Sequence, residues 1–141
     1  MDRVTDYAIC NTVPKRANQL EREGKWMMGK CFPTFGPFSP WRVTPGAVPD
    51  PQTLGSWMKA NGKRLKHIST RTMIFPIRHP VAYISRLMVL EPGDVVTTAA
   101  PPGVGLGMKP EGYMKAGDTI RLGVDGLGVH QQRVRTWPAA L

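Results

Sequence analysis

The stretch LGSWMKANGKRLKHIS, residues 54–69, predicts a β-hairpin. Its two halves flank Asn61 and Gly62, and Asn-Gly is the favoured pair for a two-residue type I′ turn. The stretch DTIRLGVDGLGVHQQRV, residues 118–134, repeats the arrangement around an Asp-Gly pair. Two strand pairs of this kind indicate a mainly β protein.

The rest of the chain agrees with this fold class. Its 141 residues include 15 glycines and 14 prolines, which is typical of short strands joined by shaped turns. The N-terminal run at 3–13 alternates enough to predict another strand, and the proline-rich segment 32–53 predicts an ordered coil. No shift in composition marks a boundary, so we expect residues 1–141 to form a single domain.

One helix is predicted in HPVAYISRLMVLEPG, residues 79–93. Pro80 suits a first turn, and Pro92 with Gly93 would end the helix. Apolar residues recur at helical spacing, namely Ile77, Val81, Ile84 and Met88. A shorter, more polar helix is predicted at 15–23. We therefore expect a mainly β domain with one packing helix.

The stretch DVVTTAAPPGVGLG, residues 94–107, predicts a strand that leads into a loop of small residues. Glycine lets a ligand approach the main chain closely, and loops that follow strands often bind ligands. EPGDVV (91–96) and KAGDTI (115–120) share a Gly-Asp pair before β-branched residues, which predicts a turn feeding a strand in each case.

The net charge is +9, from 19 Lys and Arg against 10 Asp and Glu. Such a charge favours general attraction to polyanions and says little about the fold. Basic residues are densest at 62–71, but the chain carries no recognised nucleic-acid-binding motif. We expect a solvated basic face rather than a specific nucleic-acid site.

The two cysteines, Cys10 and Cys31, form no CxxC pair, and no apolar leader follows Met1. We expect reduced thiols in the cytoplasm. No apolar run has the length needed to span a bilayer, so no membrane partner is expected.

The three histidines, His67, His79 and His130, show no metal-ligand spacing. We expect His67 in an exposed basic hairpin, His79 near a helix start and His130 in a strand. The WMM run at 26–28 is expected to pack against the core rather than to form a cofactor site.

Three longer blocks carry a resemblance to a known family. They are GKCFPTFGPFSPWRVTPGAVPDPQ (29–52), MIFPIRHPVAYISRLMVLEPGDVVTTAAPPGVGLGMKP (73–110) and YMKAGDTIRLGVDGLG (113–128). Together they resemble the C-terminal catalytic domain of the fumarylacetoacetate hydrolase family, from about residue 7 to about residue 134. That family includes fumarylpyruvate and acylpyruvate hydrolases and the isomerase/decarboxylase of homoprotocatechuate breakdown.

The resemblance implies a mixed β-roll or β-sandwich, incomplete at its N-terminus, that is usually dimeric. It also implies Mg²⁺ or Mn²⁺, held by a Glu-x-Glu pair and an Asp, acting on a small 2-oxo or diketo acid in aromatic-compound catabolism. A cation stabilises the enolate that forms when such an acid loses a carbon–carbon bond.

The acidic metal ligands of this pattern are absent from the matching positions. In NTVPKRANQ, residues 11–19, Thr12 stands where the family has its ligand Asp, and a hydroxyl is a poor ligand for a hard dication. Glu21 and Glu23 have Glu-x-Glu spacing but follow the wrong block, so we interpret them as solvated helix charges.

Substrate contacts are implied at further matching positions. By resemblance these are Gln19, Lys30, Thr34, Ala100, Pro101 and Gly103. A Lys30 ammonium could pair with a substrate carboxylate or hold an enolate oxygen. Ala100 stands where the family has a Thr whose hydroxyl touches the substrate carboxylate.

Three hypotheses remain open. The favoured one is a truncated or degenerate family member without chemistry, folding as a homodimer or with a partner subunit. The first alternative is an active metal-dependent carbon–carbon hydrolase or isomerase, completed by a partner chain. The weaker alternative is a basic module that binds nucleic acid.

Overall fold

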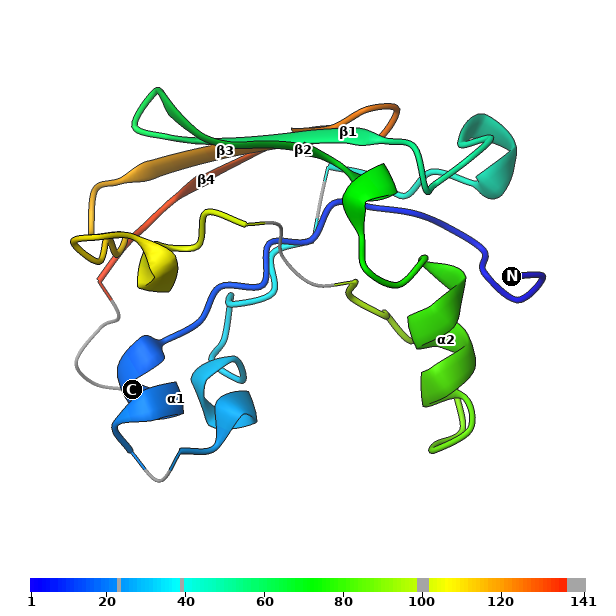
Figure 1. Ribbon diagram of the computed structural model, residues 1–141, viewed down its shortest axis with the longest axis horizontal. Coiled ribbons are helices and arrows are strands. Elements are labelled where there is room, and N and C mark those ends of the chain that lie inside the picture. The colour runs from blue at the N-terminus through cyan, green and yellow to red at the C-terminus, as the bar shows by residue number, and fades with distance from the viewer. Residues whose placement is uncertain (23, 39, 99–101, 137–141) are drawn as a thin grey trace.

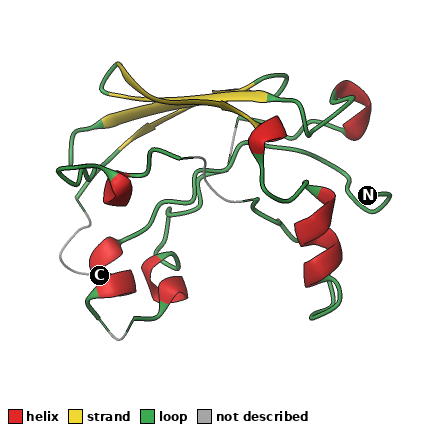
Figure 2. Ribbon diagram, in the orientation of Figure 1, coloured by secondary structure: helices red, strands yellow, loops and turns green. Residues whose placement is uncertain are grey.

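A computed structural model describes residues 1–22, 24–38, 40–98 and 102–136. Figure 1 shows an antiparallel sheet along one side of the molecule, with the helices and long coil segments on the other side. Figure 2 shows that most of the chain outside the sheet is loop. The mainly β architecture predicted from the sequence is confirmed.

The sheet consists of β1 (Gly55–Ala60), β2 (Lys63–Ser69), β3 (Thr119–Val124) and β4 (Gly128–Arg133). Its order is β2-β1-β3-β4, and all three pairings are antiparallel. Both predicted hairpins form. The pairing of β1 with β3 joins them into one sheet across a long separation in the sequence.

The first hairpin has the predicted turn. Asn61 and Gly62 both have positive φ, 48° and 80°, as a type I′ turn requires. The Asn61 side chain also bridges to the second hairpin, since its amide donates to Asp118 Oδ1 at 2.9 Å and its oxygen accepts from the Thr119 amide at 2.9 Å. One residue therefore shapes the turn and aligns β1 with β3.

The second hairpin differs from the sequence prediction. Its loop has three residues rather than two, because Val124 pairs with Gly128, and the Leu127 amide donates to the Val124 carbonyl at 2.9 Å. Asp125 does not adopt the positive φ of a type I′ turn; instead its carboxylate accepts a hydrogen bond from the Gly55 amide at 2.9 Å. This contact with β1 fixes the longer loop.

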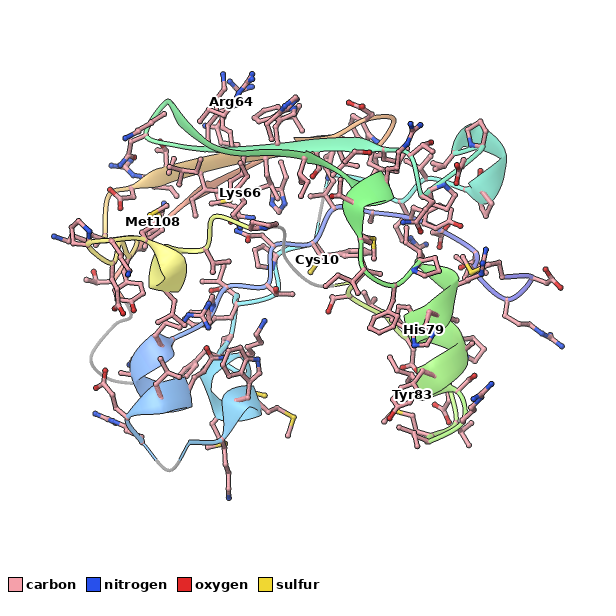
Figure 3. All side chains as sticks on the ribbon, viewed as in Figure 1. Cys10, Arg64, Lys66, His79, Tyr83 and Met108 are labelled. Carbon is pink, nitrogen blue, oxygen red and sulfur yellow. The ribbon has the colours of Figure 1, made fainter. Side chains whose placement is uncertain are left out.

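A β-bulge interrupts the pairing of β1 with β2. Met58 pairs with Lys66 and Lys59 pairs with Arg64, which leaves Leu65 as the extra residue. Because side chains alternate along a strand, the extra residue turns Arg64 and Lys66 to opposite faces. Figure 3 shows Arg64 above the sheet and Lys66 beneath it.

The buried core is small and lies where coil meets the sheet. Ile9, Val48 and Leu127 form it, each no more than 4% exposed. The predicted N-terminal strand is replaced by an extended segment with two isolated bridges, one from Tyr7 and one from Cys10. Its partner, the proline-rich coil, cannot continue a ladder because proline has no amide hydrogen.

Two short α-helices form, α1 (Arg16–Leu20) and α2 (Arg78–Ile84), both shorter than predicted. The helix α2 has no fully buried residue in the described chain, but Ile77, Val81 and Ile84 on its predicted apolar face are half-buried. Short helices depend on packing for their length, which explains the early end of α2. No helix within residues 1–22, 24–38, 40–98 and 102–136 is long and apolar enough to cross a bilayer.

The described residues form four 3₁₀ helices, η1 (Trp26–Gly29), η2 (Pro45–Ala47), η3 (Thr70–Thr72) and η4 (Gly105–Gly107). The first contains the WMM run, and the expectation that this run packs inside was wrong. Trp26, Met27 and Met28 are all more than half exposed, because η1 lies at the edge of the molecule and contacts α1 on one side.

The two Gly-Asp turns are alike in structure. In each, the aspartate carboxylate accepts from the backbone amide three residues earlier, from Glu91 to Asp94 at 2.8 Å and from Lys115 to Asp118 at 2.7 Å. Only the second turn feeds a strand. The strand predicted at 94–98 does not form, since no described segment pairs with it.

Candidate functional site

A large open groove lies beneath the sheet, with a volume of about 3610 Å³. Residues from most of the described chain line it, among them residues of α1, η1 and α2. Small-molecule sites are usually closed pockets of about 300–1,000 Å³. The groove is therefore a concave face left uncovered by the described chain, within which a smaller site must be located by its residues.

Thr12 lies on one wall of this groove. Its neighbours are fixed by the coil, because the Asn11 amide donates to the Pro37 carbonyl at 3.1 Å and the Val13 amide to the Phe35 carbonyl at 2.9 Å. These hydrogen bonds hold the backbone on both sides of position 12. That position is the one expected for a metal-binding carboxylate, but its side chain carries a hydroxyl.

The described residues do not fit a divalent metal. Across residues 1–22, 24–38, 40–98 and 102–136, no group of three His, Cys, Asp or Glu side chains is close enough to share an ion. Mg²⁺ and Mn²⁺ favour several hard oxygen ligands. No catalytic step through a metal can be assigned to these residues.

Lys30 also lines the groove and lies beside Cys10. Burial raises the pKa of the Cys10 thiol, and the positive charge of Lys30 partly opposes that shift. The segment that carries Lys30 is tied to the N-terminal chain, since the Lys15 amide donates to the Gly29 carbonyl at 2.8 Å. A cation near Cys10 therefore lines the groove.

Thr34 also lines the groove. It occupies a turn closed by a 3.1 Å hydrogen bond from the Phe35 amide to the Phe32 carbonyl. Its φ of 67° is unusual for a β-branched residue, a strained geometry that marks functional sites more often than ordinary turns. Thr12, Lys30 and Thr34 therefore all line the groove.

Gln19 is not among the residues that line the groove. Its side chain is 1% exposed; its amide donates to the Trp26 carbonyl at 2.9 Å, and its oxygen accepts from Arg16 Nη1 at 2.8 Å. Gly29 leaves room for Gln19, because a Cβ at position 29 would overlap Gln19 Cγ. Gln19 therefore joins α1 to η1 and supports the segment of Lys30. Its contact with substrate stays a prediction.

The glycine-rich loop approaches β2. Gly103 has φ +95°, which favours glycine, and a Cβ there would lie 3.1 Å from the Leu65 carbonyl and 3.4 Å from Lys66 Cγ. The loop predicted to bind a ligand therefore packs beneath the bulged strand. Ala100 and Pro101, two of the predicted contacts, lie outside the described residues.

Lys66 was missed by sequence reasoning. It lines the groove and is half-buried, and loss of hydration lowers the pKa of its ammonium group. In the sequence it belongs to a basic run expected to be solvated. The bulge that turns it inward leaves no signal in that run.

The histidines occupy the expected elements. His67 is exposed on β2, and His79 is the second residue of α2, stacked on Phe75 with ring centroids 4.5 Å apart. His130 on β4 is 8% exposed, and burial lowers its pKa, so its ring is neutral at pH 7.

Comparison with known proteins gives a consistent result. The family model for the C-terminal domain of fumarylacetoacetate hydrolase matches residues 1–135. A Burkholderia cenocepacia (strain HI2424) protein, provisionally named a hydrolase, is 51% identical over 136 residues, which are 96% of this chain and 48% of that protein. The chain spans about half the length of the curated relatives it matches.

Solved structures agree. A fumarylacetoacetate hydrolase from Exiguobacterium antarcticum is 36% identical with a TM-score of 0.90, over 96% of this chain and 48% of that chain. A maleylpyruvate hydrolase from Sphingobium sp. SYK-6, in complex with manganese(II) and pyruvate, is 31% identical with a TM-score of 0.78, over 95% and 45%. The chain belongs to the fumarylacetoacetate hydrolase family and corresponds to its C-terminal domain.

Proposed function

We propose that this chain forms an organic-acid-binding wall of a fumarylacetoacetate hydrolase-family site and does not catalyse the family's reaction by itself. One observation carries the proposal. Thr12, Lys30 and Thr34 all line the groove, while the described residues offer no cluster of acidic ligands for a cation. We assign the three residues to one wall as part of this proposal.

The chemistry available to this wall is binding and orientation. The Lys30 ammonium can pair with a carboxylate, and the Thr12 and Thr34 hydroxyls can donate hydrogen bonds to carboxylate or carbonyl oxygens. The related maleylpyruvate hydrolase structure holds pyruvate, a small 2-oxo acid, together with manganese. A small 2-oxo or diketo acid is accordingly the ligand that we propose for this wall.

The second candidate is an active enzyme completed by other polypeptide. The observation in its favour is the groove, which is several times larger than a usual ligand pocket and leaves room for a covering segment. In this version a homodimer or a partner subunit supplies the acidic ligands for Mg²⁺ or Mn²⁺. Residues 1–141 would then be a single domain of a larger site.

We also propose a reducing, cytoplasmic setting. Both cysteines are free thiols, Cys10 half-buried and Cys31 exposed. An exposed thiol persists where glutathione and thioredoxin keep cysteines reduced.

Calorimetric titration tests the function. The chain is titrated with MgCl₂ and with MnCl₂, each with and without oxaloacetate, and oxaloacetate is also titrated without metal. We expect oxaloacetate to bind and neither metal to bind tightly. Stoichiometric, tight binding of either metal would overturn the proposal, and metal binding that appears only with a second polypeptide would favour the enzyme completed by a partner.

A further inference from the structure

We infer that Lys66 is an anion-binding residue of the groove, whose ammonium pairs with a carboxylate of the bound organic acid. The inference deepens the proposed function and rests on it. It adds a second cation, on a different element from Lys30, to the surface that receives the acid.

The fold places Lys66 on the inner face of the sheet through the bulge at Leu65. Regular alternation would put Lys66 on the same face as Arg64, whose side chain rises from the outer face. With the bulge, Lys66 lies opposite Met58 and beneath the sheet, on the side where Cys10 also lies. A strand that reads as uniformly basic therefore delivers one of its cations into the groove.

The surroundings of Lys66 remove water from its side chain. Met58 lies opposite it on β1, and Leu122 lies opposite Met58 on β3, so apolar neighbours extend across the inner face. On the other side of Lys66 lies Gly103. A Cβ at position 103 would be 3.4 Å from Lys66 Cγ and 3.8 Å from Lys66 Cε. The stem is held between the sheet and the glycine-rich loop, as long cationic side chains often are.

No carboxylate balances this charge within the described chain. The ion pairs found there join the Met1 amino group to Asp2 and Arg42 to Asp6. A half-buried cation without a counterion is unfavourable, and a carboxylate that enters the groove would offset the lost hydration. Burial alone lowers the pKa of the ammonium, which agrees with the lack of a nearby carboxylate in the described chain.

Differential labelling of lysines measures whether the acid covers the Lys66 ammonium, and it uses the chain without substitutions. Lysines are acetylated at a fixed pH during titration with oxaloacetate, and each modified position is quantified by peptide mass spectrometry. We expect oxaloacetate to protect Lys66 saturably, while its uncharged dimethyl ester gives no protection. Lys59, on the outer face, serves as the internal control and should label at the same rate throughout. Equal labelling of Lys66 with and without oxaloacetate would overturn the inference, as would equal protection of Lys59.

A pair of variants separates this inference from the proposed function. Lys66→Met keeps an unbranched side chain but removes the charge, and Lys59→Met makes the same change on the outer face. We expect Lys66→Met to weaken oxaloacetate binding about tenfold to a hundredfold, the range for a charge-assisted hydrogen bond, and Lys59→Met to leave it unchanged. If the wild-type chain binds oxaloacetate and Lys66→Met binds it equally well, only the inference fails. If the wild-type chain does not bind oxaloacetate, the proposed function fails as well.

Discussion

Replacing Gln19 by alanine tests how the groove wall is held. The side chain is 1% exposed and makes two hydrogen bonds, one to the Trp26 carbonyl and one from Arg16. The substitution removes the hydrogen bond to the Trp26 carbonyl and the acceptor of the Arg16 guanidinium, and it opens a cavity beside Gly29, whose missing Cβ makes room for Gln19 Cγ. Both effects weaken the junction of α1 with η1.

The magnitude follows from these contacts. A buried polar group left without its partner costs about 1–3 kcal/mol, and the cavity adds further destabilisation that depends on how far the site collapses. We expect a total loss of about 2–4 kcal/mol in the free energy of unfolding. For a chain of this length that corresponds to a drop in Tm of roughly 6–12 °C.

The assay is urea unfolding followed by tryptophan fluorescence, with Gln131→Ala as the control, because Gln131 is exposed on β4. The control should change stability by less than about 0.5 kcal/mol. If Gln19→Ala unfolds at the wild-type urea concentration yet loses oxaloacetate binding, Gln19 is a ligand contact rather than a support of the wall, and the reasoning above is wrong.

Three further predictions concern the sheet. Gly123→Ala places a Cβ 2.7 Å from the Trp57 ring, so it should cost about 1–3 kcal/mol in urea unfolding; unchanged stability would show that the ring moves freely. Arg121 lies directly opposite Lys59, and two like charges in that arrangement repel each other. Arg121→Gln should therefore raise the free energy of unfolding by about 0.2–1 kcal/mol at low salt, and the gain should shrink in 1 M NaCl. Burial holds the pKa of His130 below its value in the unfolded chain, so the unfolded chain binds more protons. The free energy of unfolding should therefore fall as the pH drops below about 6.5 towards the lowered folded pKa. His130→Gln should flatten that part of a stability–pH profile, and an equal slope in both proteins would refute the role of His130.

Local signals predicted the sheet well. Asn61-Gly62 specified its turn because both residues tolerate positive φ, so the first hairpin could be located from the sequence alone. The Asp-Gly turn was placed correctly but assigned the wrong length, because a tertiary hydrogen bond from the Gly55 amide to Asp125 decides its geometry. Sequence patterns report such contacts only indirectly.

Predictions that depend on a distant partner were less successful. The segment 94–98 has the composition of a strand, yet a strand requires a neighbour to pair with, and the described chain provides none. The helix predicted at 79–93 ends at Ile84, and the apolar side chains that follow it, Leu87, Met88 and Val89, are exposed. Periodicity predicts what a segment can form, whereas burial decides how much of it forms.

The candidate site also depends on contacts that the local sequence does not report. Resemblance pointed to Thr12, Lys30 and Thr34, which all line the groove, and their contact with a ligand stays a prediction. Lys66 lies outside the blocks that carry the resemblance, and a single bulge residue changes the face on which it lies. Since a shift of one residue reverses every side chain that follows it in a strand, the placement of a cation in a β protein depends on register rather than on local composition. The pairing of β1 with β2 therefore decides whether the Lys66 charge faces the groove.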